Sequence, residues 1–567
     1  MKKANLILVN GNVYSIDKDG NRICGTAVAV AEDKIVAVGS DQEIKAYIDE
    51  KTEVIDCDGK SILPGLSDTH CHPSIAGATN AACDLFGIYR QDGETAAGVI
   101  EKYKERLKEY IEANPDKNLY RGTGWVEANF TGEEEYPTCE DLDQICSDKP
   151  VILEAFSQHT LWVNSKAMEI AGTDKKTPEP SIGKIYRFKD GSPSGVFNDP
   201  EAMDLIKLNV PGYDLSVEEY KEALLWYQKE CANKYGVTLA MDCMYSDNAR
   251  KAYVELAKEG KLTMRMRGVY HLEPKEPLKK LPEFIARKGR DNVGDDFRID
   301  TIKIFAEGEF SLLEPYRDEF CESCGLEKGH NGRLYWTDET FEKCAVMAME
   351  AGFNVHVHAM GDKSVKQSVD CLVNAQKKTG MEPRNAIAHL MLVPDECAEA
   401  MGKNHIVANC QMRWMVHDDD INVMIPMMGK DRAMSAYPLR KLLDNGVVVA
   451  QGTDFPVTPP PNVMHAIQCA MTRRVFKDAK DYDRLKDGVL GDEKPATLDE
   501  AIKIVTMGSA YQTFLEDVTG SIEPGKSAEL VILDRNIEET PVDEIYSIEV
   551  EKTIFKGKLV YENGKNI

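Results

Sequence analysis

The chain has 567 residues, too many for one simple hydrophobic core, so we expect two or more domains. Hydrophobic residues make up 43% and charged residues 29%, which is the balance of an ordinary globular protein. The formal net charge of -26 argues against non-specific binding to nucleic acid or to an anionic membrane. No apolar run reaches the roughly 18 residues of a membrane-spanning helix. We therefore expect a small-molecule substrate, with no nucleic-acid or membrane partner.

The 15 cysteines show no regular spacing and accompany no export signal, which is typical of the reducing cytoplasm. We accordingly predict a cytoplasmic protein. Cys321 and Cys324 form the one Cys-x-x-Cys pair, and because no second pair lies nearby its role stays open. The sequence does not fix the oligomeric state, and a homodimer is compatible with it.

Residues 1–60 predict a series of short strands. Asn10-Gly11 separates two apolar runs, which favours a hairpin. Residues 515–567 contain similar strand patterns at 529–534, 548–550, 552–555 and 558–562. Because neither piece can bury a core alone, we predict one small β-sandwich built from both ends of the chain.

The apolar run 61–66 predicts the first strand of the middle region and leads into His70 and His72. Side chains alternate between the two faces of a strand, so these two histidines project to the same side. Two neutral imidazoles that point the same way can share one divalent metal. A pair of surface or hydrogen-bonded histidines is the plainer alternative, and the rest of the chain decides between the two.

An excess of roughly 160 residues over a short βα loop follows this strand. We predict an inserted subdomain over about residues 75–230. In a barrel it would leave from the face where active sites lie, so we expect it to shape substrate choice.

The middle region, residues 61–514, alternates apolar strand candidates with helical stretches such as 338–351 and 497–509. Eight strands, each followed by room for a helix, predict an α/β fold, a (β/α)8 TIM barrel. The strand candidates are 61–66, 236–242, 262–270, 299–305, 353–358, 385–389, 406–410 and 447–454.

Five of these strands end in residues of metal-ligand type. Chance can place a histidine or an aspartate at one or two strand ends, but five ends at the catalytic face are far more specific. The residues are His70 and His72, Lys303, His358, His389 and Asp454.

The chain resembles the amidohydrolase superfamily of metal-dependent hydrolases, in particular the branch that contains N-substituted formamide deformylase. The resemblance covers essentially the whole chain. Its motifs are Leu63-Pro-Gly-Leu-Ser-Asp-Thr-His70-Cys-His72, Lys303-Ile-Phe-Ala-Glu-Gly308, Val357-His358-Ala-Met-Gly-Asp362, Ile387-Ala-His389 and Gly452-Thr-Asp454-Phe-Pro456.

The resemblance implies that His70, His72 and Asp454 hold one divalent metal, with zinc as the default. His358 and His389 would hold a second metal, bridged to the first by Lys303 after its amine has reacted with carbon dioxide. A carbamate offers two hard oxygens, whereas an ammonium cannot ligate a metal.

Lys303 has an alternative role as a cation that balances a buried carboxylate such as Glu307. The centre would then hold one metal instead of two. Asp454 would be the catalytic general base and then acid in the hydrolysis of a C–N bond.

Other residues of the same motifs have less defined roles. His356 shares the face of His358, and we interpret it as a neighbour of the ligands or a core residue, with a further ligand as the alternative. Trp125 and His159 in the insertion are candidate substrate contacts, although packing is an alternative. Glu307 either orients Lys303 or faces the substrate.

Three further readings of the same barrel stay open. A heterocycle deaminase would place a glutamate where this chain has Gly361. A cyclic amide or imide hydrolase, or an esterase, would use the same metal set. A catalytically silent barrel would have lost a ligand, and none is missing.

Overall fold

The computed structural model describes residues 3–91, 93–130, 132, 135–180, 183–308, 310–458, 461–480 and 482–565. The outermost residues of the two predicted sandwich halves, 1–2 and 566–567, lie outside that set. The chain forms two compact units. We call one the barrel unit (Met1–Pro73, Leu225–Tyr245 and Tyr253–Ile567) and the other the insert unit (Ser74–Leu224 and Ser246–Ala252).

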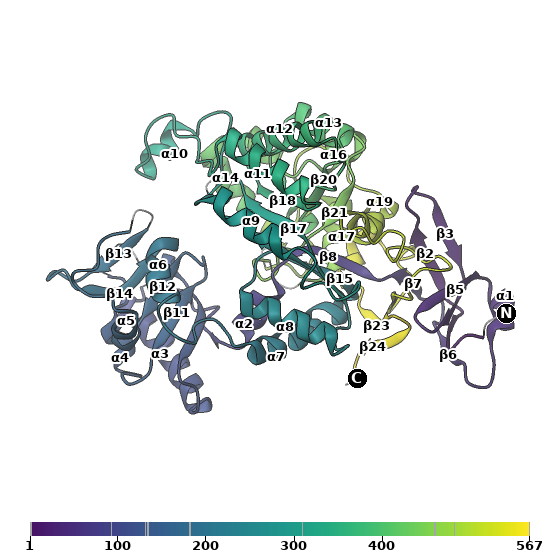
Figure 1. Cartoon of the computed structure of the whole chain (residues 1–567), viewed down its shortest axis with the longest axis horizontal. Helices are drawn as coiled ribbons and strands as arrows, with labels where there is room; N and C mark the ends of the chain where they lie inside the picture. Colours follow the sequence, from purple (N-terminus) through teal and green to yellow (C-terminus); the bar gives the residue numbers. More distant parts are fainter. Residues whose placement is uncertain are drawn as a thin grey trace. The chain divides into compact units, whose positions relative to one another are not determined.

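The predicted barrel is confirmed. Within the described residues, eight parallel strands form one sheet in the order β21-β20-β19-β18-β17-β16-β15-β8 (Figure 1). The strands are β8 (Leu66–Cys71), β15 (Val237–Asp242), β16 (Arg265–His271), β17 (Phe297–Phe305), β18 (Asn354–Ala359), β19 (Ala386–His389), β20 (Val407–Cys410) and β21 (Val449–Gln451).

The two end strands of this sheet meet at their carboxyl ends. The amide of Asp454 donates to the carbonyl of His70 at 2.8 Å, and the amide of His72 donates to the carbonyl of Phe455 at 2.8 Å. These bonds nearly close the barrel, so the carboxyl ends of all its strands surround one opening.

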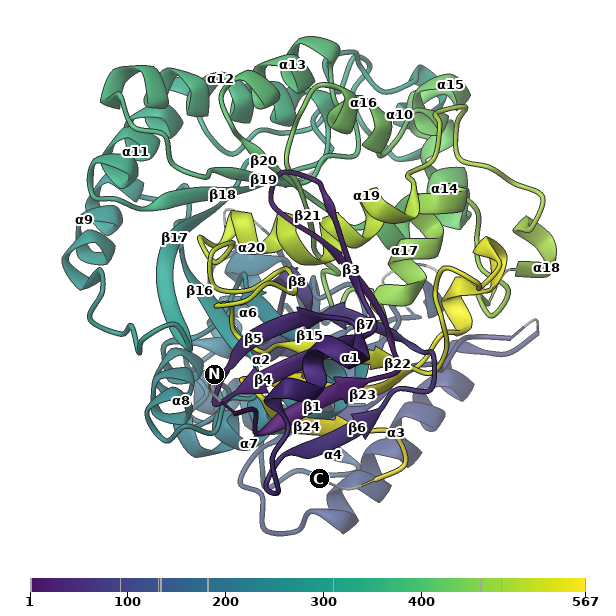
Figure 2. The same ribbon diagram turned by 90° about the vertical axis from the view of Figure 1, so that its right-hand side faces the viewer.

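Helices lie outside the curved sheet, as Figure 2 shows for α9, α11, α12 and α13. Sequence signals set their ends: the Thr337 side chain caps α11, and Gly380, with a φ of 65°, ends α12 in the left-handed conformation. The helices are α9 (Pro277–Arg287), α10 (Asp318–Ser323), α11 (Asp338–Glu350), α12 (Asp362–Thr379), α13 (Asp395–Lys403), α14 (Asp419–Met428), α15 (Lys430–Met434), α16 (Leu439–Asp444), α17 (Val463–Thr472), α18 (Tyr482–Leu485), α19 (Leu498–Lys503) and α20 (Ser509–Gln512).

Both ends of the chain build the predicted β-sandwich. One sheet has the order β5-β4-β1-β6 and the other β24-β23-β22-β7-β2-β3. Apolar residues from both ends, including Leu8, Val30, Ile532 and Ile554, share one core. The strands are β1 (Leu6–Val9), β2 (Asn12–Ile16), β3 (Arg22–Gly25), β4 (Ala27–Ala31), β5 (Lys34–Gly39), β6 (Glu53–Asp56), β7 (Ser61–Pro64), β22 (Leu530–Leu533), β23 (Val550–Phe555) and β24 (Lys558–Glu562).

Two local predictions were wrong. The turn at Asn10-Gly11 connects β1 to β2, but these strands belong to different sheets, so no hairpin forms. The run 61–66 is not a single barrel strand: β7 pairs with β2 and β22 in the sandwich, and the barrel begins with β8. Gly65 lies between the two strands, at a place where a Cβ would lie 2.0 Å from Thr238 Oγ1.

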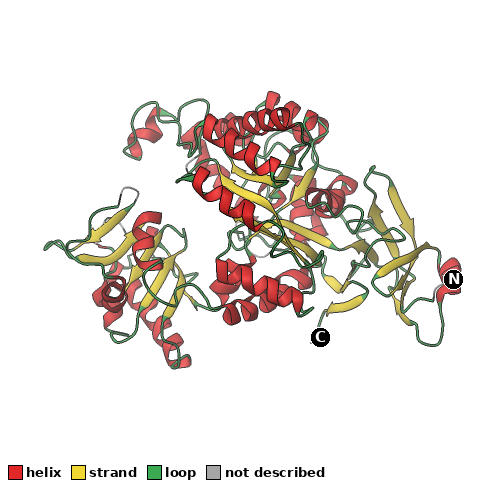
Figure 3. Cartoon of the chain, viewed as in Figure 1, coloured by secondary structure: helices red, strands yellow, loops and turns green. Residues whose placement is uncertain are grey.

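The insert unit begins directly after the first barrel strand, as predicted. Its sheet has the order β13-β14-β12-β11-β10-β9, with helices on its flanks (Figure 3). Helix α2 (Pro73–Asn80) belongs to it from the second residue of the helix. The elements wholly within it are β9 (Cys83–Asp84), α3 (Ala96–Ala113), β10 (Tyr120–Trp125), α4 (Cys139–Asp143), β11 (Val151–Ala155), β12 (Thr160–Val163), α5 (Ser165–Ala171), β13 (Lys184–Arg187), β14 (Pro193–Asn198) and α6 (Pro200–Lys207).

Helices α7 (Val217–Tyr227) and α8 (Asp247–Lys258) each contain residues of both units. Over the described ranges, no helix combines the length and apolar character needed to cross a membrane.

Candidate metal centre

The strand-end residues predicted as ligands are gathered in the mouth of the barrel. His70 and His72 come from the end of β8, Lys303 from β17, His358 from β18 and His389 from β19. Asp454 follows β21 and completes the set. Lys303 is fully buried and His70 is 1% exposed. One buried cluster therefore unites residues that are up to 384 positions apart in the chain.

Asp454 is the carboxylate of this cluster. Its Oδ1 lies 3.0 Å from His72 Nε2 and 3.4 Å from His70 Nε2. Lys303 Nζ lies 3.5 Å from the same His70 nitrogen. The resemblance assigns His70, His72 and Asp454 to the first metal, and these residues are therefore direct neighbours. Lys303 lies beside them.

His389 lies between His358 and the rest of the cluster. Its ring centroid lies 4.3 Å from that of His358 and 4.7 Å from that of His70. Ligand atoms of His70, His389 and Asp454 all lie within 4.8 Å of one another, a spacing that can hold a metal ion. The structure thus brings all six predicted residues together.

Backbone geometry directs two of these side chains inward. Asp454 and His389 have φ angles of 60° and 76°, in the left-handed region that ordinary residues rarely adopt. The loop that carries Asp454 is held by Asp68, whose carboxylate accepts from the amide of Thr453 at 2.8 Å and from its hydroxyl at 2.5 Å. Such conformations persist only where the surroundings enforce them.

Burial sets the charge states needed for metal binding. Loss of hydration, helped by the Lys303 charge, lowers the pKa of His358 to about 3, so its imidazole is neutral at pH 7. Burial also lowers the pKa of Lys303. Burial alone would raise the pKa of Asp454, but the hydrogen bond with His72 and nearby positive charges outweigh it and the pKa is lowered. Neutral imidazoles beside an ionised carboxylate are a metal-ligand set.

An orphaned nitrogen supports the same conclusion. His389 Nδ1 lies 3.0 Å from Gln411 Oε1, while its buried Nε2 has no hydrogen-bond partner among the described residues. Buried polar atoms are nearly always satisfied, so this nitrogen lacks a partner that a metal would provide. The residues present fit a divalent ion.

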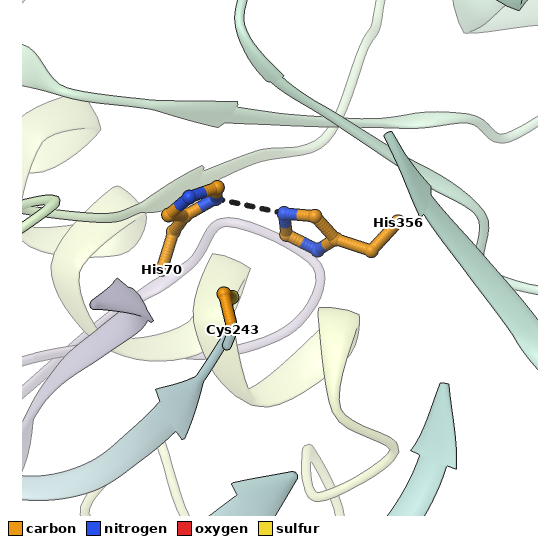
Figure 4. A group of neighbouring side chains, drawn as sticks. All are labelled: His70, Cys243 and His356. Atoms are coloured by element: carbon orange, nitrogen blue, oxygen red, sulfur yellow. Dashed lines mark hydrogen bonds between the residues drawn. The ribbon is translucent and has the colours of Figure 1, made fainter. Parts of the chain in front are cut away.

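A second group, His70, Cys243 and His356, lies beside the first (Figure 4). His70 Nδ1 and His356 Nε2 are 2.8 Å apart, a hydrogen bond between two buried imidazoles. His356 is thus a direct neighbour of a predicted ligand, as one of its interpretations required. Burial raises the pKa of Cys243 to about 12, so this residue, which follows β15, holds a neutral thiol.

Comparison with known proteins identifies the chain. A model of the amidohydrolase family matches residues 53–561. The chain belongs to the amidohydrolase family. It is therefore a hydrolase acting on C–N bonds other than peptide bonds, and a metal-dependent one.

Two relatives align with this amidohydrolase over nearly their full length. YtcJ of Bacillus subtilis (strain 168), whose name assigns it to the amidohydrolases, is 28% identical over 98% of this chain and 99% of its own. N-substituted formamide deformylase of Arthrobacter pascens is 24% identical over 98% of both. A crystal structure of a metal-dependent hydrolase from Pyrococcus furiosus superposes with a TM-score of 0.70 at 25% identity, covering 94% of this chain and 99% of that one.

The predicted substrate contacts are placed differently from the ligands. Trp125 is fully buried in the insert core, where its Nε1 donates to the Leu153 carbonyl at 3.2 Å. It has no surface to offer a ligand, so the packing alternative replaces the substrate contact. His159 in the insert unit is exposed, and its Nδ1 lies 3.1 Å from Asp199 Oδ1.

Glu307 of this amidohydrolase joins two loops. Its carboxylate accepts from the backbone amides of Ser311 at 2.5 Å, Met360 at 2.6 Å and Gly361 at 3.0 Å. Both oxygens are used to join the loops after β17 and β18. Neither a hydrogen bond nor an ion pair joins Glu307 to Lys303 among the described residues, and its contact with substrate stays a prediction.

Sequence reasoning missed two side chains at this site. His271 ends β16 next to Lys303 in the strand register, and the predicted strand stopped one residue short of it. Trp414 stacks on His389, with ring centroids 5.6 Å apart and planes 10° apart. It lies in the short turn Met412–Trp414 after β20, outside every motif that the sequence singled out.

Proposed function

We propose that this amidohydrolase hydrolyses the C–N bond of a non-peptide amide, with N-substituted formamides and other N-acyl amines as the substrate classes to test first. The carrying observation is the contact of Asp454 with both His72 and His70 inside a buried ligand cluster. The name of the deformylase, which aligns over the whole chain, supports the substrate class.

We assign the metal positions as follows. His70, His72 and Asp454 would hold one zinc, and His358 with His389 would hold a second. Lys303, as a carbamate, would supply oxygen ligands to the pair. In support, no ion pair joins Lys303 to a carboxylate among the described residues, and burial lowers the pKa of its amine.

A bound divalent ion supplies Lewis acidity, which lowers the pKa of water and polarises a carbonyl. The protein supplies the proton transfer. Asp454 accepts the proton of the attacking water and returns it to the departing amine nitrogen, acting as general base and then as general acid. Its lowered pKa keeps the carboxylate ionised, which is the form that accepts a proton, and the side chain is buried.

The deaminase alternative lacks a proton shuttle. Gly361 occupies the place where such relatives carry a glutamate, and a Cβ there would lie 2.1 Å from the Ser311 carbonyl oxygen. No side chain fits unless that loop moves. Cyclic amide and imide hydrolysis uses the same ligands and is the second substrate class to screen.

The test is metal stoichiometry by elemental analysis of protein purified without chelators, for wild type and Lys303→Ala. Two metals per chain that fall to one or none in the variant support the bridged pair. One metal in both proteins makes the centre mononuclear. An amide panel of N-formyl amines, N-acetyl amines and cyclic imides then assigns the substrate class, and no turnover of any member by the metal-loaded enzyme contradicts the proposal.

A further inference from the structure

Two aromatic side chains lie beside one of the proposed ligands. Trp414 stacks on His389, with ring centroids 5.6 Å apart and planes 10° apart, and the ring centroid of Tyr437 lies 6.2 Å from that of Trp414. The Trp414 ring is held by its Nε1, which donates to the Thr458 hydroxyl at 2.6 Å. An aromatic wall therefore extends from the metal centre along Trp414 to Tyr437.

The backbone of Tyr437 is held in a conformation that few residues adopt. Its φ is 54°, in the left-handed region. Its amide donates to the carbonyl of Met391, in the loop after β19, at 2.7 Å, and its own carbonyl accepts from Arg473 Nη1 at 3.1 Å. Such conformations persist only where the surroundings enforce them, and they cluster at functional sites. The fold thus fixes the direction of the Tyr437 ring.

The hydroxyl of Tyr437 has no hydrogen-bond partner among the described residues, although the residue is only 5% exposed. Buried tyrosine hydroxyls usually find a partner. Burial raises the pKa of this hydroxyl, and so do the negative charges of Asp418, Asp420 and Asp454. The protonated hydroxyl therefore lies among carboxylates that include the proposed general base, and a substrate could provide its missing partner.

Three consecutive aspartates at the start of α14 differ in their partners. Asp418 caps the helix and accepts from the Ile421 amide at 3.2 Å. Asp419 accepts from Arg484 Nη1 at 2.7 Å, so its charge is balanced. Neither Asp418 nor Asp420 has a cationic partner among the described residues. Two of the three charges are therefore left without a counter-charge.

These unbalanced charges strain one another. Burial and the charge of Asp420 raise the pKa of Asp418 to about 6, and loss of hydration with the charge of Asp419 raises the pKa of Asp420. Asp418 is still mainly ionised at pH 7, and a nearby cation would relieve the repulsion. The formal net charge of -26 also attracts cationic molecules from solution.

Aromatic rings and unpaired carboxylates together recognise an ammonium group. The face of an indole or phenol ring attracts a cation, and a carboxylate accepts a charge-assisted hydrogen bond from it. A neutral group would leave both carboxylates unpaired, and an anion would be repelled. The residues that offer this chemistry, which we call the aromatic–acidic group, are Trp414, Tyr437, Asp418 and Asp420.

We propose that the aromatic–acidic group binds an ammonium group of the substrate while the amide of the substrate lies at the metal centre. The substrate class is then N-acyl amines that carry a second, positively charged amine. This inference rests on the proposed function, because it requires an amide substrate at the metal centre.

The test compares two formamides of equal length. N-formyl-diaminobutane ends in an ammonium group, whereas N-formylpentylamine ends in a methyl group of similar size. The ratio of their kcat/KM values with zinc-loaded wild type is the selectivity for a cation. Diamines from diaminoethane to diaminohexane locate the best spacing between amide and ammonium, and the N-acetyl counterparts are measured in parallel.

We expect wild type to prefer the ammonium compound by roughly 10-fold or more, through a lower KM. The double variant Asp418→Asn/Asp420→Asn should lose this preference. Asparagine is as good a helix cap as aspartate, so α14 keeps its start. Asp419→Asn is the matched control: it removes an adjacent charge that Arg484 already balances, and its selectivity should equal that of wild type.

Equal kcat/KM values for the two compounds in wild type, or a double variant that keeps the preference, overturn the inference and leave the proposed function intact. An equal loss of selectivity in Asp419→Asn also overturns it, because overall charge would then be the cause. Turnover of no amide by zinc-loaded wild type overturns the proposed function. Calorimetric titration of that same protein with both compounds then decides the cation question separately: tighter binding of the ammonium compound supports the inference, and equal affinity overturns it.

Discussion

The mouth of the barrel and the core of the insert unit both bury aromatic rings that contain nitrogen. The hydrogen bonding of these nitrogens differs between the two regions. Trp125 in the insert has its one N–H bonded to a backbone carbonyl at 3.2 Å. His389 in the barrel has Nδ1 bonded and Nε2 without a partner among the described residues. A satisfied buried group maintains the fold, whereas an unsatisfied one at a strand end indicates a missing ligand.

The largest expected effect concerns the mouth of the barrel, where Asp454 lies. Asp454→Asn keeps the size of the side chain and removes its capacity to accept and return a proton. We expect turnover to fall by about 10²- to 10⁴-fold while metal content is retained. Steady-state kinetics and elemental analysis on the same preparation measure both. Turnover within threefold of wild type would show that another group moves the proton.

Trp125→Ala tests the core of the insert unit, where the buried ring has its hydrogen bond. Removal of a fully buried tryptophan costs about 3–5 kcal/mol of unfolding free energy. Trp125 also contacts Trp162, with ring centroids 6.2 Å apart, so the cavity would disturb the insert core. Denaturant unfolding measures the loss, and Trp125→Phe is the control that keeps most of the packing. A stable Trp125→Ala with a raised KM would instead return Trp125 to the substrate site.

The contrast also explains how much the sequence could predict. The meeting of the six predicted ligand residues was predictable because parallel strands converge at one end, so strand order and a residue at each strand end suffice to place His70, Lys303 or Asp454. The sheets of the sandwich were predictable for a similar reason, because both ends of the chain carry short strands that need partners.

Contacts that depend on packing were not predictable. Nothing in the alternation of residues separates β7 from β8; the two differ in their partners, since β7 pairs with β2 and β22 whereas β8 pairs with β15. Trp125 looks the same in sequence whether it lines a pocket or a core. Gln512 on α20 donates through its Nε2 to the carbonyl of Thr69, 443 residues earlier in the chain, and no local pattern marks it.

The smallest expected effect concerns a satisfied charge on the barrel surface. Arg440 donates twice to Glu500, at 2.9 and 2.7 Å, and this bond lowers the pKa of Glu500 to about 2 from 4.5. Because the folded pKa lies below the unfolded one, the pair stabilises the fold above pH 4.5 and that contribution is lost as the pH falls toward 2. Solvent screens the pair, since Glu500 is partly exposed, so the gain is small.

Glu500→Gln should therefore lower stability slightly at neutral pH and flatten the dependence of Tm on pH between 4.5 and 2. Glu322→Gln on α10 is the control, because Glu322 is exposed and has no arginine partner among the described residues. An unchanged pH profile in Glu500→Gln would mean that the bond to Arg440 contributes nothing in solution. Metal content should be the same in both variants, because neither Glu500 nor Glu322 belongs to the predicted ligand set.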